Sequence, residues 1–407
     1  MANTAITAIL GLGYWFLATH LYPPAEFGDG QTLISAMRLF SSLAGLAFVG
    51  TMARFIPVAG RRTGALILYG YAAASGLGLL GAAVFLILLP VWGDAYGHLT
   101  GVGPGLFFLG SVLTWTIFTL LDVTLAGLRK AVWVPVVSVV YGLGKMAALA
   151  ALALAPPSSG VLGGVYLSWI VPAAVVLLPA GRLIAKVVRC HGTHTTFPLS
   201  LAQVARFMAG DLPGALSLLL TLYLTPVMVA AWLDDPVTFG YFSLVHTLGC
   251  IVGLLAANVG VSVTVEAPAE ARARASVVRH AFRRALVLVG PIVVITVAAA
   301  PLISWAFGHG AAVAVPLLRL MALAVLPGLV VEIYLATLRS QNQARKLAIV
   351  QLGLALSILG VTAALFPVAG IAAVGYATLA SQTIVVLLIL PDLRRALAVK
   401  RSLNRGG

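Results

Sequence analysis

The chain consists of long apolar stretches separated by short polar connectors. Each stretch continues for about 20 residues, the length of a bilayer-spanning helix, without the alternation expected of a barrel strand. Helices also satisfy their backbone hydrogen bonds internally, as lipid requires. The pattern therefore predicts an all-α polytopic membrane protein with about twelve transmembrane helices. The predicted spans are Thr4–Tyr22, Gln31–Ala53, Thr63–Leu89, Pro104–Ala126, Val132–Leu154, Val161–Leu183, Leu212–Trp232, Phe239–Val263, Ala285–Phe307, Val313–Leu338, Leu347–Phe366 and Ile371–Leu390.

The amino-acid composition also indicates a membrane protein, and the sequence argues against several classes of function. Of 407 residues, 61% are hydrophobic and 9% charged, whereas a soluble protein carries about 25% charged residues. The sequence contains no Walker A loop, which argues against nucleotide hydrolysis. A membrane glycosyltransferase, polymerase or ligase would need a large outer loop with catalytic residues, whereas the longest outer connector, Val91 to Gly103, has only Asp94 and His98. We therefore predict a secondary-type transporter rather than an enzyme, with no cofactor and no bound metal.

The distribution of basic residues predicts the orientation. The chain carries 25 Lys and Arg residues, and all but Arg38, Lys145 and Arg319 lie in or beside the connectors that share one side of the membrane with both termini. By the positive-inside rule this side is the cytoplasm. The net charge of +14 thus belongs to membrane-flanking loops, which argues against nucleic-acid binding and predicts membrane lipids as partners.

Two short segments of the first half recur in the second half. Pro24–Gly28 matches Pro236–Gly240, and Asp122–Arg129 matches Glu332–Arg339 at almost the same offset. Six spans per repeat is an even number, so the sequence predicts two parallel six-helix repeats, an arrangement found in transporters. The predicted domains are an N-terminal six-helix bundle (1–184), a cytoplasmic interfacial connector (185–210), and a C-terminal six-helix bundle with a short basic cytoplasmic tail (211–407).

Three cations lie within predicted spans. Arg38 and Lys145 fall near mid-depth, and Arg319 lies about six residues from the outer end of its span. Charges at such depths are costly and usually face a protein interior or a polar cavity. Fixed Arg and Lys charges suit a diphosphate group, so we predict that Arg38, Lys145 and Arg319 bind substrate. Structural ion pairing is the alternative for all three, and the long Arg319 side chain could also reach the outer interface.

Two acidic residues occupy matching positions in the repeats. Asp122 precedes Arg129 by seven residues, and Glu332 precedes Arg339 by the same interval. Seven residues are two helical turns, so both acids are expected at the same depth in the inner half of their spans. We predict that these four residues serve gating or ion coupling. The acids either pair with a basic residue to hold one conformation closed or carry a coupling ion.

Several segments resemble a known family. Tyr22–Gly28, Ile34–Met37 and Ala53–Pro57 resemble the start of Wzx-like O-antigen and polysaccharide flippases. These proteins belong to the multidrug/oligosaccharidyl-lipid/polysaccharide (MOP) exporter superfamily. Trp115–Asp122 and Gly127–Pro135 are similar to the fourth and fifth helices of the same group. The resemblance is firmest in the first half of the chain.

The resemblance implies two six-helix bundles, a cationic cavity and alternating access. It implies a flippase that moves a polyprenyl-pyrophosphate-linked glycan from the inner to the outer leaflet of the bacterial cytoplasmic membrane. The expected partners are the lipid-linked glycan and proteins of polysaccharide assembly. Two alternatives stay open: an ion-coupled drug or small-molecule exporter of the same superfamily, and a non-transporting membrane component of polysaccharide assembly.

Overall fold

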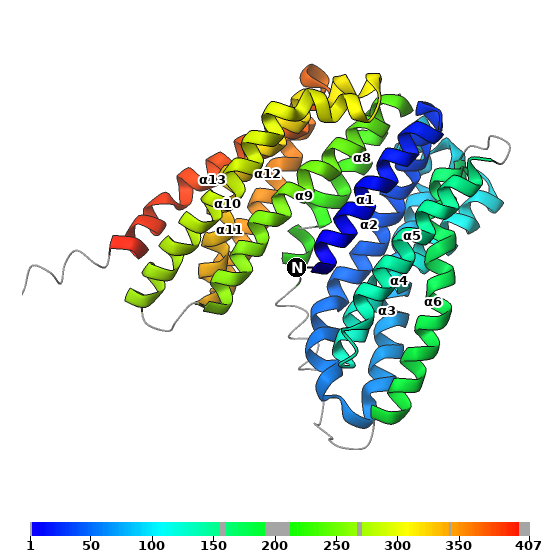
Figure 1. Ribbon diagram of the computed structural model, residues 1–407, viewed down its shortest axis with the longest axis horizontal. Coiled ribbons are helices and arrows are strands. Elements are labelled where there is room, and N and C mark those ends of the chain that lie inside the picture. Colours follow the sequence, from blue (N-terminus) through cyan, green and yellow to red (C-terminus); the bar gives the residue numbers. More distant parts are fainter. Residues whose placement is uncertain are drawn as a thin grey trace, which may run out of the picture. The chain divides into compact units, whose positions relative to one another are not determined.

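The computed structural model describes residues 2–154, 160–191, 212, 214–217, 219–233, 235–266, 271–341 and 343–398. The chain divides into two compact units, residues 1–240 and 241–407, and the division falls inside helix α9. Both units are helical wherever regular structure is described (Figure 1).

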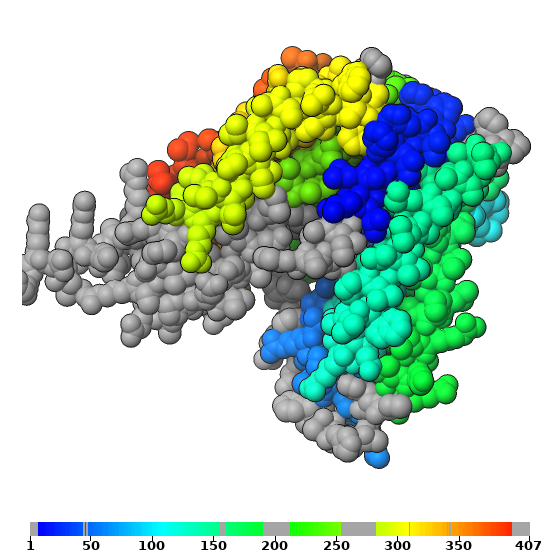
Figure 2. Space-filling view, viewed as in Figure 1, coloured from blue at the N-terminus to red at the C-terminus, as the bar shows by residue number. Residues whose placement is uncertain are grey.

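Among the described residues, eight α-helices contribute to the first unit. They are α1 Ala2–Leu21, α2 Pro24–Phe55, α3 Thr63–Ile87, α4 Val102–Gly127, α5 Trp133–Leu152, α6 Gly164–His191, α8 Thr225–Trp232 and the first residues of α9 Pro236–Glu266. Helix α2 packs against α3 and α4, α1 packs against α5, and α5 packs against α6. In Figure 2, α1 (blue), α5 (blue-green) and α6 (green) form the viewed face of this unit. This packing brings α1, α2, α4, α5 and α6 around the pocket described below.

In the described part of the second unit, the rest of α9 is followed by four further α-helices. These are α10 Ala271–Ala306, α11 Val315–Ser340, α12 Ala344–Ala369 and α13 Ala372–Ala398. Helix α11 packs against α10, α12 and α13. Its contact with α10 is an apolar seam that includes Val289, Val325 and Leu329.

Every predicted span coincides with helix in the described residues, and the predicted fold class is confirmed. Within the described part of the chain, ten helices are long and apolar enough to cross a membrane. The bent pair Pro24–Leu43 and Phe48–Val58 adds an eleventh if it is one span, and Thr7–Leu21 is a shorter apolar helix. Helix α6 continues to His191, so the start of the predicted 185–210 connector is helical. Residues 192–210 and the tail from 399 lie outside the described residues, and the predicted domain limits stay predictions.

The segments Pro24–Gly28 and Pro236–Gly240, which match in sequence, contact each other within the first unit. A Cβ atom built on Gly28 would overlap the carbonyl group of Pro236. A Cβ atom on Gly240 would lie 2.8 Å from the ring of Phe27 and 3.1 Å from the Cα atom of Gly28. Two backbones approach this closely because both positions lack a side chain, as in other close helix contacts.

Candidate functional site

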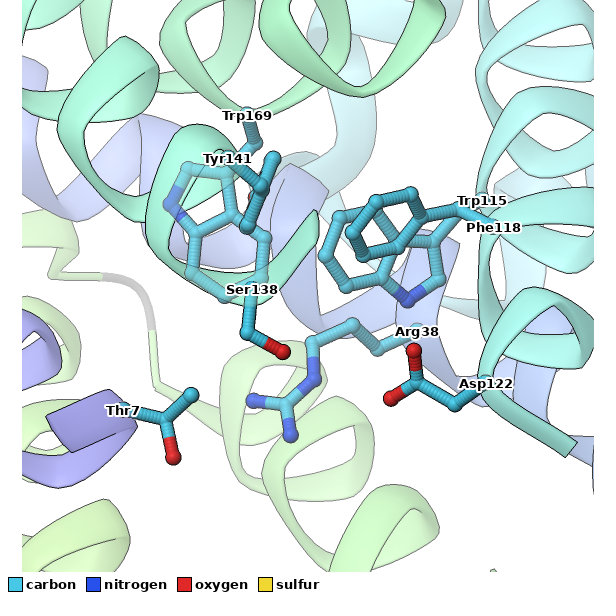
Figure 3. A pocket seen from close by; sticks show the side chains of 8 residues that line it. All are labelled: Thr7, Arg38, Trp115, Phe118, Asp122, Ser138, Tyr141 and Trp169. Carbon is cyan, nitrogen blue, oxygen red and sulfur yellow. The ribbon is translucent and has the colours of Figure 1, made fainter. Parts of the chain in front are cut away.

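The first unit contains a pocket of about 260 Å³. Figure 3 shows the side chains that line it, which come from α1, α2, α4, α5 and α6. They are Thr7, Arg38, Trp115, Phe118, Asp122, Ser138, Tyr141 and Trp169. Four of them are aromatic and four are polar or charged, so the pocket combines an aromatic wall with hydrogen-bonding groups.

Helical spacing explains how α4 contributes to this wall. Trp115, Phe118 and Asp122 follow one another at intervals of three and four residues, which places them on one face of the helix. Ser138, Tyr141 and Lys145 have the same spacing on α5. Each helix therefore presents aromatic and charged groups together along one stripe.

Arg38 extends from α2 into the pocket. Figure 3 shows its guanidinium group in the cavity, with the Ser138 hydroxyl group and the Asp122 carboxylate also pointing into this space. The guanidinium carbon lies 5.8 Å from the ring centroid of Trp169 and 5.2 Å from that of Tyr223. These distances suit cation–π attraction, which stabilises a cation without neutralising its charge.

Lys145 lies among aromatic rings and does not itself line the pocket. Its side chain is 7% exposed. The ammonium nitrogen lies 4.0 Å from the ring centroid of Tyr14, 4.4 Å from Trp169, 5.6 Å from Tyr141 and 5.8 Å from Trp15. Tyr141 and Trp169 also form the pocket wall, so the ammonium group lies close to two of the rings that line the pocket.

One of these rings is fixed by hydrogen bonds. The Tyr14 hydroxyl group is within 2.8 Å of the Ser168 hydroxyl group and donates to the carbonyl oxygen of Val165 at 3.2 Å. Neither Arg38 nor Lys145 forms an ion pair with a carboxylate of the described residues. Both side chains thus lie near aromatic rings rather than in ion pairs within the described part of the chain.

The acidic and loop residues predicted for gating lie at different places. Asp122 lines the pocket, and its side chain is exposed. Arg129 lies just after α4 with a φ of 59°, in the left-handed region. The amide of Arg129 donates to Ala126 and that of Lys130 to Leu125, which is the Schellman pattern that normally has glycine at this position. Arg129 therefore ends α4 in an unfavourable backbone conformation.

The second unit holds the other three predicted residues on α11. Glu332 is half-buried and Arg339 is exposed. The Nε group of Arg319 donates to the carbonyl oxygen of Val297 in α10 at 3.2 Å. This carbonyl lacks its usual helical partner, because the residue four positions later is Pro301, which has no N–H group. In this structure Arg319 therefore satisfies an acceptor that the proline leaves open.

The aromatic rings were not predicted as site residues, although the sequence holds a signal for them. Trp and Tyr in membrane proteins usually gather at the interfaces. Trp15, Trp115 and Tyr141 instead lie well inside their predicted spans. An aromatic residue at that depth gains nothing from the headgroups, so its position points to a role inside the protein. Among the described residues, no cluster of His, Cys, Asp and Glu is placed to hold a metal ion.

Comparison with known proteins identifies the fold. No family model and no curated protein sequence matches the chain. Among solved structures, the lipid II flippase MurJ in an inward closed conformation matches with a TM-score of 0.72 at 12% identity, over 98% of this chain and 89% of that one. An inward-facing multidrug resistance MATE family transporter of the MOP superfamily matches with a TM-score of 0.59 at 11% identity, over 97% and 96%.

A third match is a MOP superfamily transporter from Pyrococcus furiosus, for which a binding pocket of reversed polarity is described. Its TM-score is 0.55 at 15% identity, over 97% of this chain and 93% of that one. At these identities the likeness establishes the fold. The chain is a multi-pass membrane protein with the fold of the MOP superfamily transporters.

Proposed function

We propose that this protein is an alternating-access flippase for a polyprenyl-diphosphate-linked oligosaccharide or polysaccharide precursor. It moves this cargo from the inner to the outer leaflet of the bacterial cytoplasmic membrane, with both termini in the cytoplasm. It acts as a transporter and not as an enzyme, and proteins of polysaccharide assembly are its partners. The observation that carries the proposal is the guanidinium group of Arg38 in a pocket whose rings also lie close to the ammonium group of Lys145.

The charge of the pocket supports an anionic cargo. A cation at the centre of a membrane costs about 3 kcal/mol on insertion scales. Desolvated cation–π contacts return about 2 kcal/mol, so the rings offset much of this cost for Lys145 without a carboxylate. The positive field then remains available to a phosphate group. Arg38 has the geometry to bind such a group through two parallel hydrogen bonds, and Lys145 adds its field from beside the same rings.

The fold supports a transporter or flippase. It does not identify the cargo, because one fold serves many functions, so the cargo is inferred from the residues of the pocket. MurJ shares the fold and is a lipid II flippase. The MATE transporter shares the fold and confers multidrug resistance. For the present chain, the choice of a lipid-linked anion over a drug rests on Arg38 and Lys145.

Asp122 is the proposed coupling residue. It shares the pocket with Arg38, so the arrival of an anionic cargo at Arg38 changes the electrostatic environment of the Asp122 carboxylate. We propose that Asp122 and its counterpart Glu332 carry the coupling ion. Arg129 and Arg339 close the inner side by attracting these acids in one conformation. Arg319 is proposed as a secondary contact for the cargo.

A second candidate function is export of an organic cation, and the combination of Asp122 with aromatic rings favours it. Aromatic rings and a carboxylate attract cations. Two cations already lie at the same rings, however, and like charges repel a third. The two candidates predict opposite effects of removing Arg38. Loss of this charge weakens transport of a lipid-linked anion and strengthens transport of a cation.

Complementation tests the proposal. In a strain lacking this gene, the wild-type chain restores glycan export. We expect the double variant Arg38→Ala, Lys145→Ala to reduce export at least tenfold while the amount of protein in the membrane is unchanged. The single variant Arg38→Lys keeps the charge and retains part of the activity. Arg61→Ala is the matched control, because Arg61 is an exposed basic residue outside the pocket.

Export and abundance are measured together, by glycan labelling and immunoblotting. Wild-type export by the double variant would contradict the proposed role of the cations. Increased export of an organic cation by Arg38→Ala, with glycan export unaffected, would favour the second candidate.

A further inference from the structure

The aromatic wall of the pocket is more extensive than phosphate binding requires. The ring centroid of Trp115 lies 5.3 Å from Phe118, 5.9 Å from Tyr141 and 5.1 Å from Trp169. Phe118 and Tyr141 are 4.7 Å apart. Four rings from three helices thus form one continuous surface. Trp169 and Tyr141 lie near the two cations, but phosphate recognition by cations and N–H donors does not account for Trp115 and Phe118.

The polar groups of the pocket face the same space as the rings. Ser138 contributes a hydroxyl group and Asp122 a carboxylate, and both are drawn toward the cavity in Figure 3. A carboxylate accepts hydrogen bonds, and a hydroxyl group both donates and accepts them, so these two side chains can bind the hydroxyl groups of a bound molecule.

We propose that this pocket is a saccharide subsite, which rests on the proposed flippase function. A pyranose ring has an apolar face of C–H groups and a rim of hydroxyl groups. The C–H face lies on Trp115 and Phe118. The rim hydroxyl groups bond to Asp122 and to the Ser138 hydroxyl group, while Arg38 holds the phosphate attached to the same sugar.

The dimensions and chemistry of the pocket favour this occupant. Its volume of about 260 Å³ is below the roughly 300–1,000 Å³ of sites for drug-sized ligands, which suits a single sugar residue. A lipid chain would cover the rings but would offer no hydrogen bonds to Asp122 and Ser138. An organic cation would lie beside Arg38 and near Lys145, where like charges repel it.

Binding measurements with two kinds of lipid test the subsite. The purified full-length protein is titrated with undecaprenyl diphosphate and with the same lipid carrying one glucose, galactose or N-acetylglucosamine residue. We expect at least one glycosylated lipid to bind about tenfold tighter than the bare lipid. In the Trp115→Leu variant we expect the ratio of the two affinities, glycosylated to bare lipid, to fall to about one. The affinity for the bare lipid should be unchanged. Trp133→Leu is the matched control, because Trp133 is 45% exposed at the start of α5 and does not line the pocket.

Ser138→Ala removes only a hydroxyl group that lines the pocket, so it tests the subsite with a small change to the wall. We expect this variant to lose about threefold to tenfold of the affinity for the glycosylated lipid and none for the bare lipid. Equal wild-type affinity for bare and glycosylated lipids would overturn the subsite and leave the flippase proposal standing. So would an equal weakening of both lipids by Trp115→Leu. Absence of binding by every lipid would instead overturn the proposed function.

Discussion

The two mid-membrane cations of the first unit differ in what surrounds them. Arg38 reaches into a pocket, whereas the ammonium group of Lys145 is enclosed by rings of Tyr14, Trp15, Tyr141 and Trp169. Substitution of Arg38 therefore removes a group that can contact cargo. Substitution of Lys145 removes a charge and also leaves the rings around it without their common partner. In the proposed function, Arg38 contacts the anionic cargo, whereas Lys145 attracts it electrostatically without contact.

Arg319 has a contact that can be tested separately from any role in binding. Its Nε group bonds to the Val297 carbonyl oxygen, which Pro301 leaves without a helical donor. We expect Arg319→Leu to lower the free energy of unfolding by about 1–3 kcal/mol. In a Pro301→Ala background the effect should be smaller, because the backbone amide that alanine supplies at this position then bonds to the same carbonyl.

Thermal unfolding of the four proteins in detergent measures this coupling, and about 1 kcal/mol is expected. Arg284→Leu is the control, since Arg284 is an exposed basic residue of the same helix α10. Additive effects of the two substitutions would show that the contact does not stabilise the helix pair. If Arg319→Leu reduces glycan export by the same factor in the wild-type and the Pro301→Ala backgrounds, this result would instead support the predicted role of Arg319 in substrate binding.

At the level of elements, the contact between the starts of α2 and α9 depends on Gly28. Any side chain at this position meets the carbonyl group of Pro236, a backbone atom that cannot turn away. We expect Gly28→Ala to lower the unfolding free energy by more than about 3 kcal/mol, or to prevent accumulation of the protein.

Gly11→Ala in α1 is the comparison for this prediction. A Cβ atom there meets nothing within 4 Å, so the substitution should be neutral or stabilising by up to about 1 kcal/mol. Membrane abundance and melting temperature of both variants are measured side by side. Equal behaviour of the two variants would show that the two segments do not pack as described.

The helices were predictable because apolar length alone identifies a span, but their ends were less so. Helix α2 begins at Pro24 and not at Gln31, since Pro is favoured in the first turn and the polar residues that follow lower the hydropathy of the segment. Near the start of this helix, the carboxylate oxygen Oδ2 of Asp29 lies 3.4 Å from Nε2 of His98. Helix α10 begins at Ala271, 14 residues before the predicted Ala285, because a basic amphipathic run continues the helix beyond the apolar stretch.

The site was predictable only in part for a related reason. A charge within a span is visible in the sequence, so Arg38, Lys145 and Asp122 could be chosen as candidates. The partners of a charge depend on packing between helices distant in the chain. For this reason the cage around Lys145 and the bond from Arg319 to Val297 could not be predicted from the sequence.

At the level of the whole molecule, the orientation derived from the basic residues is testable by cysteine labelling. The two natural cysteines, Cys190 and Cys250, are first replaced by serine. Cysteines at Thr100 and Leu154 should then react with an impermeant thiol reagent in intact cells. Cysteines at Arg61 and Lys130 should react only after the cells are opened.

This pattern follows because Thr100 and Leu154 lie in connectors without Lys or Arg, whereas Arg61 and Lys130 lie in basic connectors. The four positions alternate along the chain, so a miscounted span would place at least one on the wrong side. Labelling of Arg61→Cys in intact cells would contradict both the orientation and the span count of the first unit.

Transport by the purified protein tests the central claim most directly. The protein is reconstituted into liposomes that contain a polyprenyl diphosphate lipid carrying a labelled sugar, and the fraction of lipid accessible from outside is followed over time. We predict that the wild type moves the lipid between leaflets at least tenfold faster than protein-free liposomes, and that Arg38→Ala, Lys145→Ala removes this increase while Arg61→Ala retains it. Movement at the protein-free rate by the wild type under an imposed ion gradient, or full activity of the double variant, would contradict the account.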